Sequence, residues 1–275
     1  MPAVVTLDLV APADLWVYPA RLHGAACAMV ERQWGGGHCA QRKPFSVGPL
    51  LGGGSGAARW RLGWLADPVP RLSPEVVRFG PHPCAVADCQ TREVPFASLA
   101  AGPPAWSAEL DVISPLYFSR NGRDHPLPDP VLMLRSTLDR WNAFAPAPLA
   151  VPEPVRRELL ATVWLAAMDG RTVSTAVTAT MQQTGFVGTA RLALTRAAGR
   201  VAATAFAALM RFADIAGIGA QTTHGFGAVR LRQLNTAAPA RTPYRSTSAG
   251  PKTPRSSQPR SRSSAATPEV FEDHN

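Results

Sequence analysis

The residue types best suited to acid–base chemistry lie in the N-terminal part of the chain, where histidines occur near lysine and arginine. His23, His38 and Lys43 fall within 21 residues, and Arg42 adjoins the lysine. Histidine titrates near neutral pH and can accept or release a proton, whereas lysine and arginine can stabilise negative charge on a reacting group. His38 is one candidate for a general base or acid, because it follows a run of glycines and precedes Arg42 and Lys43.

His23 and Tyr18 are further candidates for the same chemistry. His23 falls early in a predicted helix, and Tyr18 offers a hydroxyl at the helix entrance. Each has a structural alternative: His38 as an exposed loop histidine, His23 as a packed or capping helix residue, and Tyr18 as a half-buried aromatic. No pair of carboxylates has the spacing of metal ligands, so we expect neither a metal ion nor another cofactor.

A second informative stretch is Gly217-Ile-Gly-Ala-Gln-Thr-Thr-His-Gly-Phe-Gly227, with four glycines in eleven residues between a predicted helix and a predicted strand. Glycine accepts positive φ, and such a loop can present N–H groups to phosphate. The Walker lysine and the GxGxxG register are absent, which favours a nucleic-acid backbone over a nucleoside triphosphate. The alternative is a turn that only lets helix and strand pack. Candidate nucleic-acid contacts are Arg42, Gly217, Gly219, Gln221, Thr222, Thr223, His224, Gly225 and Gly227.

Composition points to an anionic partner. The chain has 275 residues and a formal net charge of +9, and nucleic acid is the commonest partner of such a basic protein. Its four cysteines form no CxxC pair, which argues against a zinc site. No apolar run of 18 residues and no signal peptide is present, so we expect a cytoplasmic protein without a membrane partner.

The elements that would hold these residues form two similar units. The first unit, residues 1–103, has the predicted order βαββαβ: strand 4–10, helix 20–34, strand pair 45–51 and 58–65, helix 73–79, and a strand within 84–99. The second unit, residues 104–235, reads βααββαβ: strand 106–113, helices 130–144 and 153–168, strands 172–181 and 186–195, helix 197–213, and a last strand after the glycine-rich loop. Residues 236–275, rich in Pro, Ser and Arg, are predicted to be disordered.

Five segments of the chain resemble one known family. They are Arg21-Leu-His-Gly24, His38 with Lys43-Pro-Phe-Ser46, Val112-Ile-Ser-Pro-Leu-Tyr-Phe118, Thr184-Gly-Phe-Val-Gly-Thr-Ala190, and the terminal Gly-Ile-Gly…Gly-Phe-Gly. Their order is similar to that of the CRISPR-associated repeat-RNA-binding superfamily, and most closely to its sixth Cas family of endoribonucleases. The resemblance covers roughly residues 1–234; glycines at 35–37 and 52–56 and the histidine within the loop depart from the pattern.

The resemblance implies an α+β fold of tandem ferredoxin-like units and a precursor CRISPR RNA substrate cut within each repeat. The implied reaction needs no metal: the ribose 2′-OH attacks the adjacent phosphate, leaving a 2′,3′-cyclic phosphate and a 5′-OH. His38 and Lys43, with His23 and Tyr18 as alternatives, are then the implied catalytic residues.

Two alternatives stay open at this point. One is a non-catalytic RNA-binding subunit of a CRISPR effector complex. The other, a general RNA-recognition protein, is disfavoured because neither unit carries the aromatic RNP pattern. Partnership with effector subunits and homodimerisation are also left open.

Overall fold

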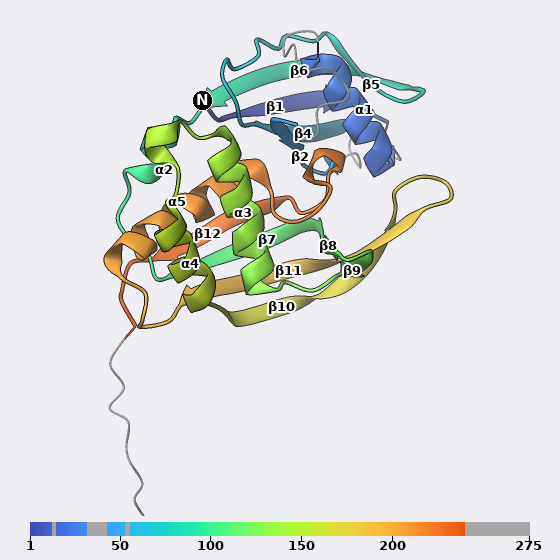
Figure 1. Ribbon diagram of the computed structural model, residues 1–275. Helices are drawn as coiled ribbons and strands as arrows, with labels where there is room; N and C mark the ends of the chain where they lie inside the picture. The colour runs from blue at the N-terminus through green and yellow to red at the C-terminus, as the bar shows by residue number, and fades with distance from the viewer. Residues whose placement is uncertain (13–14, 32–42, 53–55, 240–275) are drawn as a thin grey trace, which may run out of the picture. The chain divides into compact units, whose positions relative to one another are not determined.

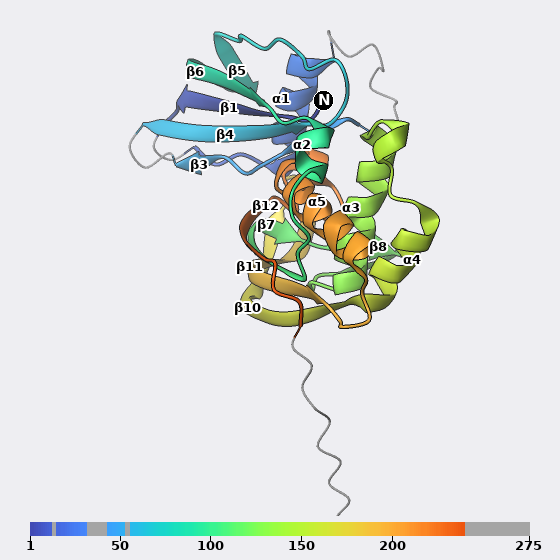
Figure 2. The ribbon, with the colours of Figure 1, turned by 90° about the vertical axis from the view of Figure 1, so that its left-hand side faces the viewer.

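The first half of the molecule is built on an antiparallel sheet with one long helix. The computed structural model describes residues 1–12, 15–31, 43–52 and 56–239. The sheet has the order β2-β4-β1-β6-β5 (Figure 1), and the short strand β3 also pairs with β4 (Figure 2). Its strands are β1 (Ala3–Val10), β2 (Phe45–Val47), β3 (Leu51–Gly52), β4 (Ala57–Trp64), β5 (Val76–Phe79) and β6 (His82–Glu93), and its helix is α1 (Pro19–Val30).

The second half repeats the plan around a four-stranded sheet of order β10-β11-β7-β12. Helices α3, α4 and α5 cover one face of this sheet (Figures 1 and 2). The strands are β7 (Ser107–Leu116), β10 (Val163–Ala176), β11 (Gln182–Leu194) and β12 (Val229–Asn235), and the helices are α3 (Pro130–Phe144), α4 (Glu153–Thr162) and α5 (Arg200–Ala216). Shorter elements are α2 (Phe96–Ala100), the β8–β9 hairpin (Phe118–Arg120 and Arg123–His125), and the 3₁₀ turns η1 (Ala147–Leu149) and η2 (Thr222–His224).

The predicted α+β class and tandem ferredoxin-like arrangement are confirmed. In the first half β1 lies between β4 and β6, with β2 at one edge; in the second half β7 lies between β11 and β12, with β10 at one edge. The prediction for residues 130–144 matches α3, where Asp129 caps the helix by accepting a hydrogen bond from the Leu132 amide at 2.8 Å. Residues Met1–Ala240 form one compact unit, and the division at residues 103 and 104 stays a prediction.

The helix predicted for residues 73–79 does not form, and this prediction was wrong. Residues Val76–Phe79 form β5, which pairs with β6. Val77 and Phe79 are buried whereas Val76 and Arg78 are exposed, the period of two expected for a strand. Neighbouring valines favour extended backbone, and Gly80, at φ +66°, provides the turn into β6. A strand therefore stands where the second helix of the first unit was expected.

Two boundaries in the second unit were also misplaced. The helix predicted for residues 153–168 ends at Thr162, because Val163 adopts extended backbone and begins β10. The turn predicted near residues 182–185 lies instead before β11, where the Val177 amide donates to the Met181 carbonyl at 2.7 Å. Gly185 serves a close approach within the strand: a Cβ there would lie 2.8 Å from the Pro115 side chain and 2.9 Å from the Leu116 backbone.

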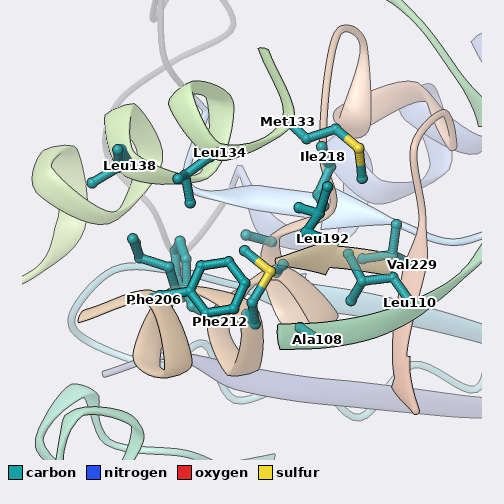
Figure 3. Packing of buried hydrophobic residues seen from close by; sticks show 14 of the residues in the cluster. Ala108, Leu110, Met133, Leu134, Leu138, Leu192, Phe206, Phe212, Ile218 and Val229 are labelled. Carbon is teal, nitrogen blue, oxygen red and sulfur yellow. The ribbon is translucent and has the colours of Figure 1, made fainter. Parts of the chain in front are cut away.

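The core of the second half lies between its sheet and its helices. Leu134 and Leu138 of α3, with Phe212 of α5, are fully buried. They pack toward side chains of the sheet such as Leu110 and Leu192 (Figure 3). Because this core fixes α3 and α5 on the sheet, it also fixes the loop that leaves the C-terminal end of α5.

Candidate active site

Helix α1 presents His23 at the boundary between its buried and exposed faces. Leu22, Ala26 and Val30 of this helix are buried against the first sheet, whereas His23 is only partly buried. The helix begins with Pro19, whose fixed φ suits the first helical position. The packed helix therefore holds the backbone of His23 in place, and the ring is left to contact residues of other segments.

The glycine-rich loop fixes the orientation of the His23 ring. Its Nδ1 lies 2.9 Å from the carbonyl oxygen of Thr223. A carbonyl can only accept a hydrogen bond, so Nδ1 carries the hydrogen and donates it. In the neutral ring the proton-accepting nitrogen is then Nε2.

Lys43 places a positive charge beside that nitrogen. Its Nζ lies 3.4 Å from His23 Nε2 and 3.3 Å from Cys27 Sγ, and the lysine side chain is only 12% exposed. Glu31 at the end of α1 lies 3.9 Å from the same ammonium group. Burial raises the pKa of the Cys27 thiol despite the nearby lysine, so this sulfur is a neutral neighbour at physiological pH.

A second histidine from the loop stacks on the first. The rings of His23 and His224 are 3.9 Å apart and nearly parallel, with an interplanar angle of 5°. Burial, reinforced by the nearby His23 and Lys43, lowers the pKa of His224 to about 4. His224 is therefore uncharged at neutral pH.

The glycines of the loop serve its own packing more than an open phosphate cradle. Gly217, Gly219, Gly225 and Gly227 all have positive φ. A Cβ on Gly219 would lie 2.5 Å from the Tyr117 carbonyl oxygen, and one on Gly227 would lie 1.8 Å from that of Ile218. The amides of Gly219 and Gly227 donate to Ser136 Oγ and the Pro115 carbonyl, both at 2.9 Å.

The middle of the glycine-rich loop, residues 221–223, lines a cleft that a ligand could enter. Gln221 has left-handed backbone (φ +51°) and lies between the packed ends of the loop. Gln221, Thr222 and Thr223 line a cleft together with Lys43 and Arg140. Two cationic side chains and several neutral polar groups therefore border the same cleft, next to His23.

Arg140 of α3 locks the loop to the rest of the protein. Its guanidinium donates to the Ala216 carbonyl at 2.5 Å, to the Phe45 carbonyl at 3.1 Å, and to the Thr222 hydroxyl. These partners belong to the end of α5, to β2 and to η2. Burial lowers the pKa of Arg140 to about 10, which leaves it charged at neutral pH.

The structure brings together part of the predicted site. One cluster is formed by His23 of α1, Lys43 just before β2, and Thr223 and His224 of η2. Tyr18, the residue before α1, packs away from this cluster, edge-on to Trp16 and under the Arg21 guanidinium. His38 and Arg42 lie outside the described residues.

Two arginines of α4 have acidic partners. Arg156 pairs with Asp139 at 3.1 Å, and Arg157 pairs with Glu153 at 3.6 Å. No sequence pattern pointed to Arg140, because its hydrogen-bond partners come from distant segments. The sequence could have indicated that Cys27 is a neighbour of His23, because it lies four residues later on the same helix face.

The described residues contain neither a cluster of metal ligands nor a membrane-spanning helix. Among these residues, no three His, Cys, Asp or Glu side chains are grouped so that they could hold a metal ion. Within the same ranges, none of the helices has the length and apolar character that crossing a membrane requires.

Comparisons with known proteins agree on one family. Residues 110–229 match the family model described as CRISPR-associated endoribonuclease Cas6. A product complex of the Cas6 protein TTHA0078 is 30% identical, with a TM-score of 0.72 over 84% of this chain and 100% of that one. Its substrate mimic complex is 31% identical, with a TM-score of 0.70 over 84% of this chain and 99% of that one.

A further solved structure extends this likeness. Thermus thermophilus Cas6 (TTHB231) is 25% identical, with a TM-score of 0.62 over 84% of this chain and 98% of the other. No curated protein matches the chain. The structural matches take in both halves of the molecule, whereas the family model covers the stretch from β7 to the start of β12.

Proposed function

Because the chain belongs to the Cas6 family of CRISPR-associated endoribonucleases, we propose that it cleaves precursor CRISPR RNA within the repeats, without a metal ion. An RNA-processing role follows from the family; the mechanism is our proposal. In it, the ribose 2′-oxygen bonds to the adjacent phosphorus, and the bond from phosphorus to the 5′-oxygen breaks. The products are a 2′,3′-cyclic phosphate and a 5′-OH.

The observation that carries the mechanism is the fixed orientation of His23. With Nδ1–H held by the Thr223 carbonyl, Nε2 is the nitrogen able to accept the 2′-OH proton. Lys43, at 3.4 Å from this nitrogen, is placed to stabilise the negative charge that develops on the phosphate oxygens. His23 is therefore the proposed general base, and Lys43 the proposed electrostatic stabiliser.

The leaving 5′-oxygen needs a proton to complete the reaction. The sequence predicts His38 as a general base or acid, and we assign it the role of general acid here because His23 takes that of the base. The sequence also predicts that the protein acts in the cytoplasm with CRISPR repeat RNA. Association with effector subunits or with a second copy stays a prediction.

The proposed RNA path starts from the cleft beside the cluster. Lys43 and Arg140 supply positive charge there, and Gln221 and Thr223 supply neutral polar groups. Such a surface suits a phosphodiester backbone, whose binding weakens as salt increases. The scissile phosphate would lie between this cleft and His23 Nε2.

Single-turnover cleavage of synthetic repeat RNA in EDTA tests the mechanism. We expect the wild-type protein to cut at an unchanged rate in EDTA and to leave a 2′,3′-cyclic phosphate. A 2′-deoxy nucleotide at the cut position should abolish cleavage, because the attacking oxygen is missing. A strict requirement for Mg²⁺ or Mn²⁺ would refute the proposal, and binding without any cleavage would favour the non-catalytic subunit.

Variants of the cluster test the assigned roles. His23→Ala should slow cleavage by about 10²–10⁴-fold, the usual effect of losing a general acid or base. Lys43→Met should slow it strongly, and Lys43→Arg should recover part of the rate because the charge is kept. Arg135→Met, on the exposed face of α3, is the matched control for lost positive charge. His38→Ala should also be slow; a wild-type rate would remove His38 from the mechanism.

A further inference from the structure

We propose that His224 is a positioning residue: its ring and the preceding Thr223 carbonyl hold the His23 imidazole in the orientation needed for proton transfer. This inference rests on the proposed catalytic role of His23. It assigns to the loop histidine a role other than direct contact with RNA.

The first support is that the loop contacts the His23 ring on two sides. Thr223 binds the edge of the ring through its carbonyl at 2.9 Å, and His224 covers a face at a ring separation of 3.9 Å. Residues 223 and 224 are adjacent, so one short 3₁₀ turn supplies both contacts. Rotation of the His23 ring about its side-chain bonds would break the hydrogen bond and the stack together.

The second support is that the turn itself is anchored. Arg140 donates to the hydroxyl of Thr222, the residue before Thr223, and the hydroxyl of Thr223 lies 3.1 Å from His224 Nδ1. Gly225, at φ +92°, ends the turn against Leu22 of α1. The anchor therefore runs from α3 through η2 to the ring on α1.

The third support is electrostatic. Among the described residues, the charged and titratable groups near the two rings include Lys43, just before β2, with Cys27 and Glu31 at the C-terminal half and end of α1. Arg140 of α3 contacts the same turn through Thr222. Burial and the nearby positive charges keep His224 neutral, with a pKa of about 4. A neutral ring can stay stacked when His23 takes up a proton, whereas two imidazolium ions at this separation would repel.

A neutral His224 has a specific consequence for its role. At neutral pH it lacks the acidic imidazolium proton that a general acid would donate, and the ring it touches is the proposed base itself. Its contribution to the rate should therefore come from geometry. Misplacing a catalytic group by about 1 Å can cost about 10²-fold in rate.

Three variants separate geometry from proton transfer. His224→Ala removes the stacked ring, His224→Phe keeps a planar ring that cannot titrate, and His23→Ala/His224→Ala tests whether the two residues act together. The measurements are the single-turnover rate, its dependence on pH, and the affinity for repeat RNA with a 2′-deoxy cut site. Circular dichroism and thermal melting establish that each variant is folded.

We expect His224→Ala to slow cleavage by about 10–100-fold with RNA affinity changed by less than about threefold. His224→Phe should recover most of the rate and keep the wild-type pH profile, because the stack is preserved. The double variant should be no slower than His23→Ala, since residues acting through one another are not additive. If His224→Ala does not fold, the His224→Phe result and its pH profile decide the question.

Several outcomes would overturn the inference. One is a wild-type rate for His224→Ala in an enzyme that still depends on His23; the proposed function would survive. Another is a His224→Phe variant as slow as His224→Ala with an altered pH profile, which would make His224 a proton-transfer group. A wild-type rate for His23→Ala would refute the proposed base, and a slow His224→Ala in that case would also refute positioning through His23.

Discussion

The hydroxyl of Ser46 donates to the carbonyl oxygen of Ile215 at 2.5 Å, and both residues are buried. Ser46 belongs to β2 and Ile215 to the last turn of α5, so this bond joins the two halves of the molecule. Close by, Arg61 of β4 pairs with Asp214 at 2.7 Å. The candidate site lies at the same junction, because β2 follows Lys43 and α5 leads into the glycine-rich loop.

Gly63→Ala should disrupt this junction. A Cβ at residue 63 would lie 1.9 Å from the Ile215 carbonyl oxygen and 2.6 Å from Ser46 Oγ, so backbone must move apart. We expect a loss of more than about 2 kcal/mol in the free energy of unfolding, measured by denaturant titration. Gly24→Ala in α1 is the control, since nothing lies within 4 Å of its added Cβ. It should stabilise by about 0.5–1 kcal/mol, and equal effects of the two changes would contradict this account.

Arg140→Met should loosen the loop from its anchor. The change leaves the Ala216 and Phe45 carbonyls and the Thr222 hydroxyl without their common donor. Losing buried partners costs about 1–3 kcal/mol each at most, and displaced η2 should also slow RNA cleavage. Thermal melting and single-turnover cleavage measure the two effects. Arg135→Met on the exposed side of the same helix should change neither, and an Arg140→Met protein with native stability and rate would refute the anchor.

The sequence predicted correctly the secondary-structure elements that are specified by neighbouring residues in the chain. Residues 130–144 combine a Pro after an Asp cap with apolar spacing of a helix, and α3 matches this range. In residues 73–79, Ser73 could cap a helix, but the acid that completes a capping box is missing. Val76 and Val77 favour extended backbone, and a strand forms there. Gly185 suggested a turn, but it allows strand β11 to pass close to Leu116 of β7. A close approach between distant strands leaves no local signature.

The sequence indicated which residue types could form the candidate site, but it did not predict how they are arranged in space. His23 and Lys43 are near in sequence, and their chemistry pointed to the site. The stack of His23 on His224 joins residues 201 positions apart, and the Thr223 contact is made by backbone. Side-chain identity carries no information about such a backbone acceptor. Arg140 was missed for the same reason, since two of its three acceptors are carbonyl oxygens.

His224 should make folding stability depend on pH. Its pKa is about 4 in the folded protein against 6.5 for the free side chain, so the unfolded chain binds the extra proton between these values. Stability is therefore lost as pH falls from about 6.5 toward 4 and regained as pH rises. Denaturant unfolding at several pH values should show this slope in the wild type and a smaller slope in His224→Phe. His125→Phe, at an exposed position in β9, is the control; identical slopes in all three proteins would contradict the prediction.

Gly219→Ala distinguishes a packing role of the loop glycines from direct contact with RNA. The residue has φ +88°, and a Cβ would lie 2.5 Å from the Tyr117 carbonyl oxygen. Gly122→Ala in the β8–β9 turn is the matched control, because it has φ +71° with nothing within 4 Å. The control should cost about 1–2 kcal/mol from backbone strain alone, and Gly219→Ala should cost clearly more. Affinity for repeat RNA should fall only to the extent that the fold is disturbed. A Gly219→Ala protein with native melting and tenfold weaker RNA binding, about 1.4 kcal/mol, would instead assign the glycine to direct RNA contact.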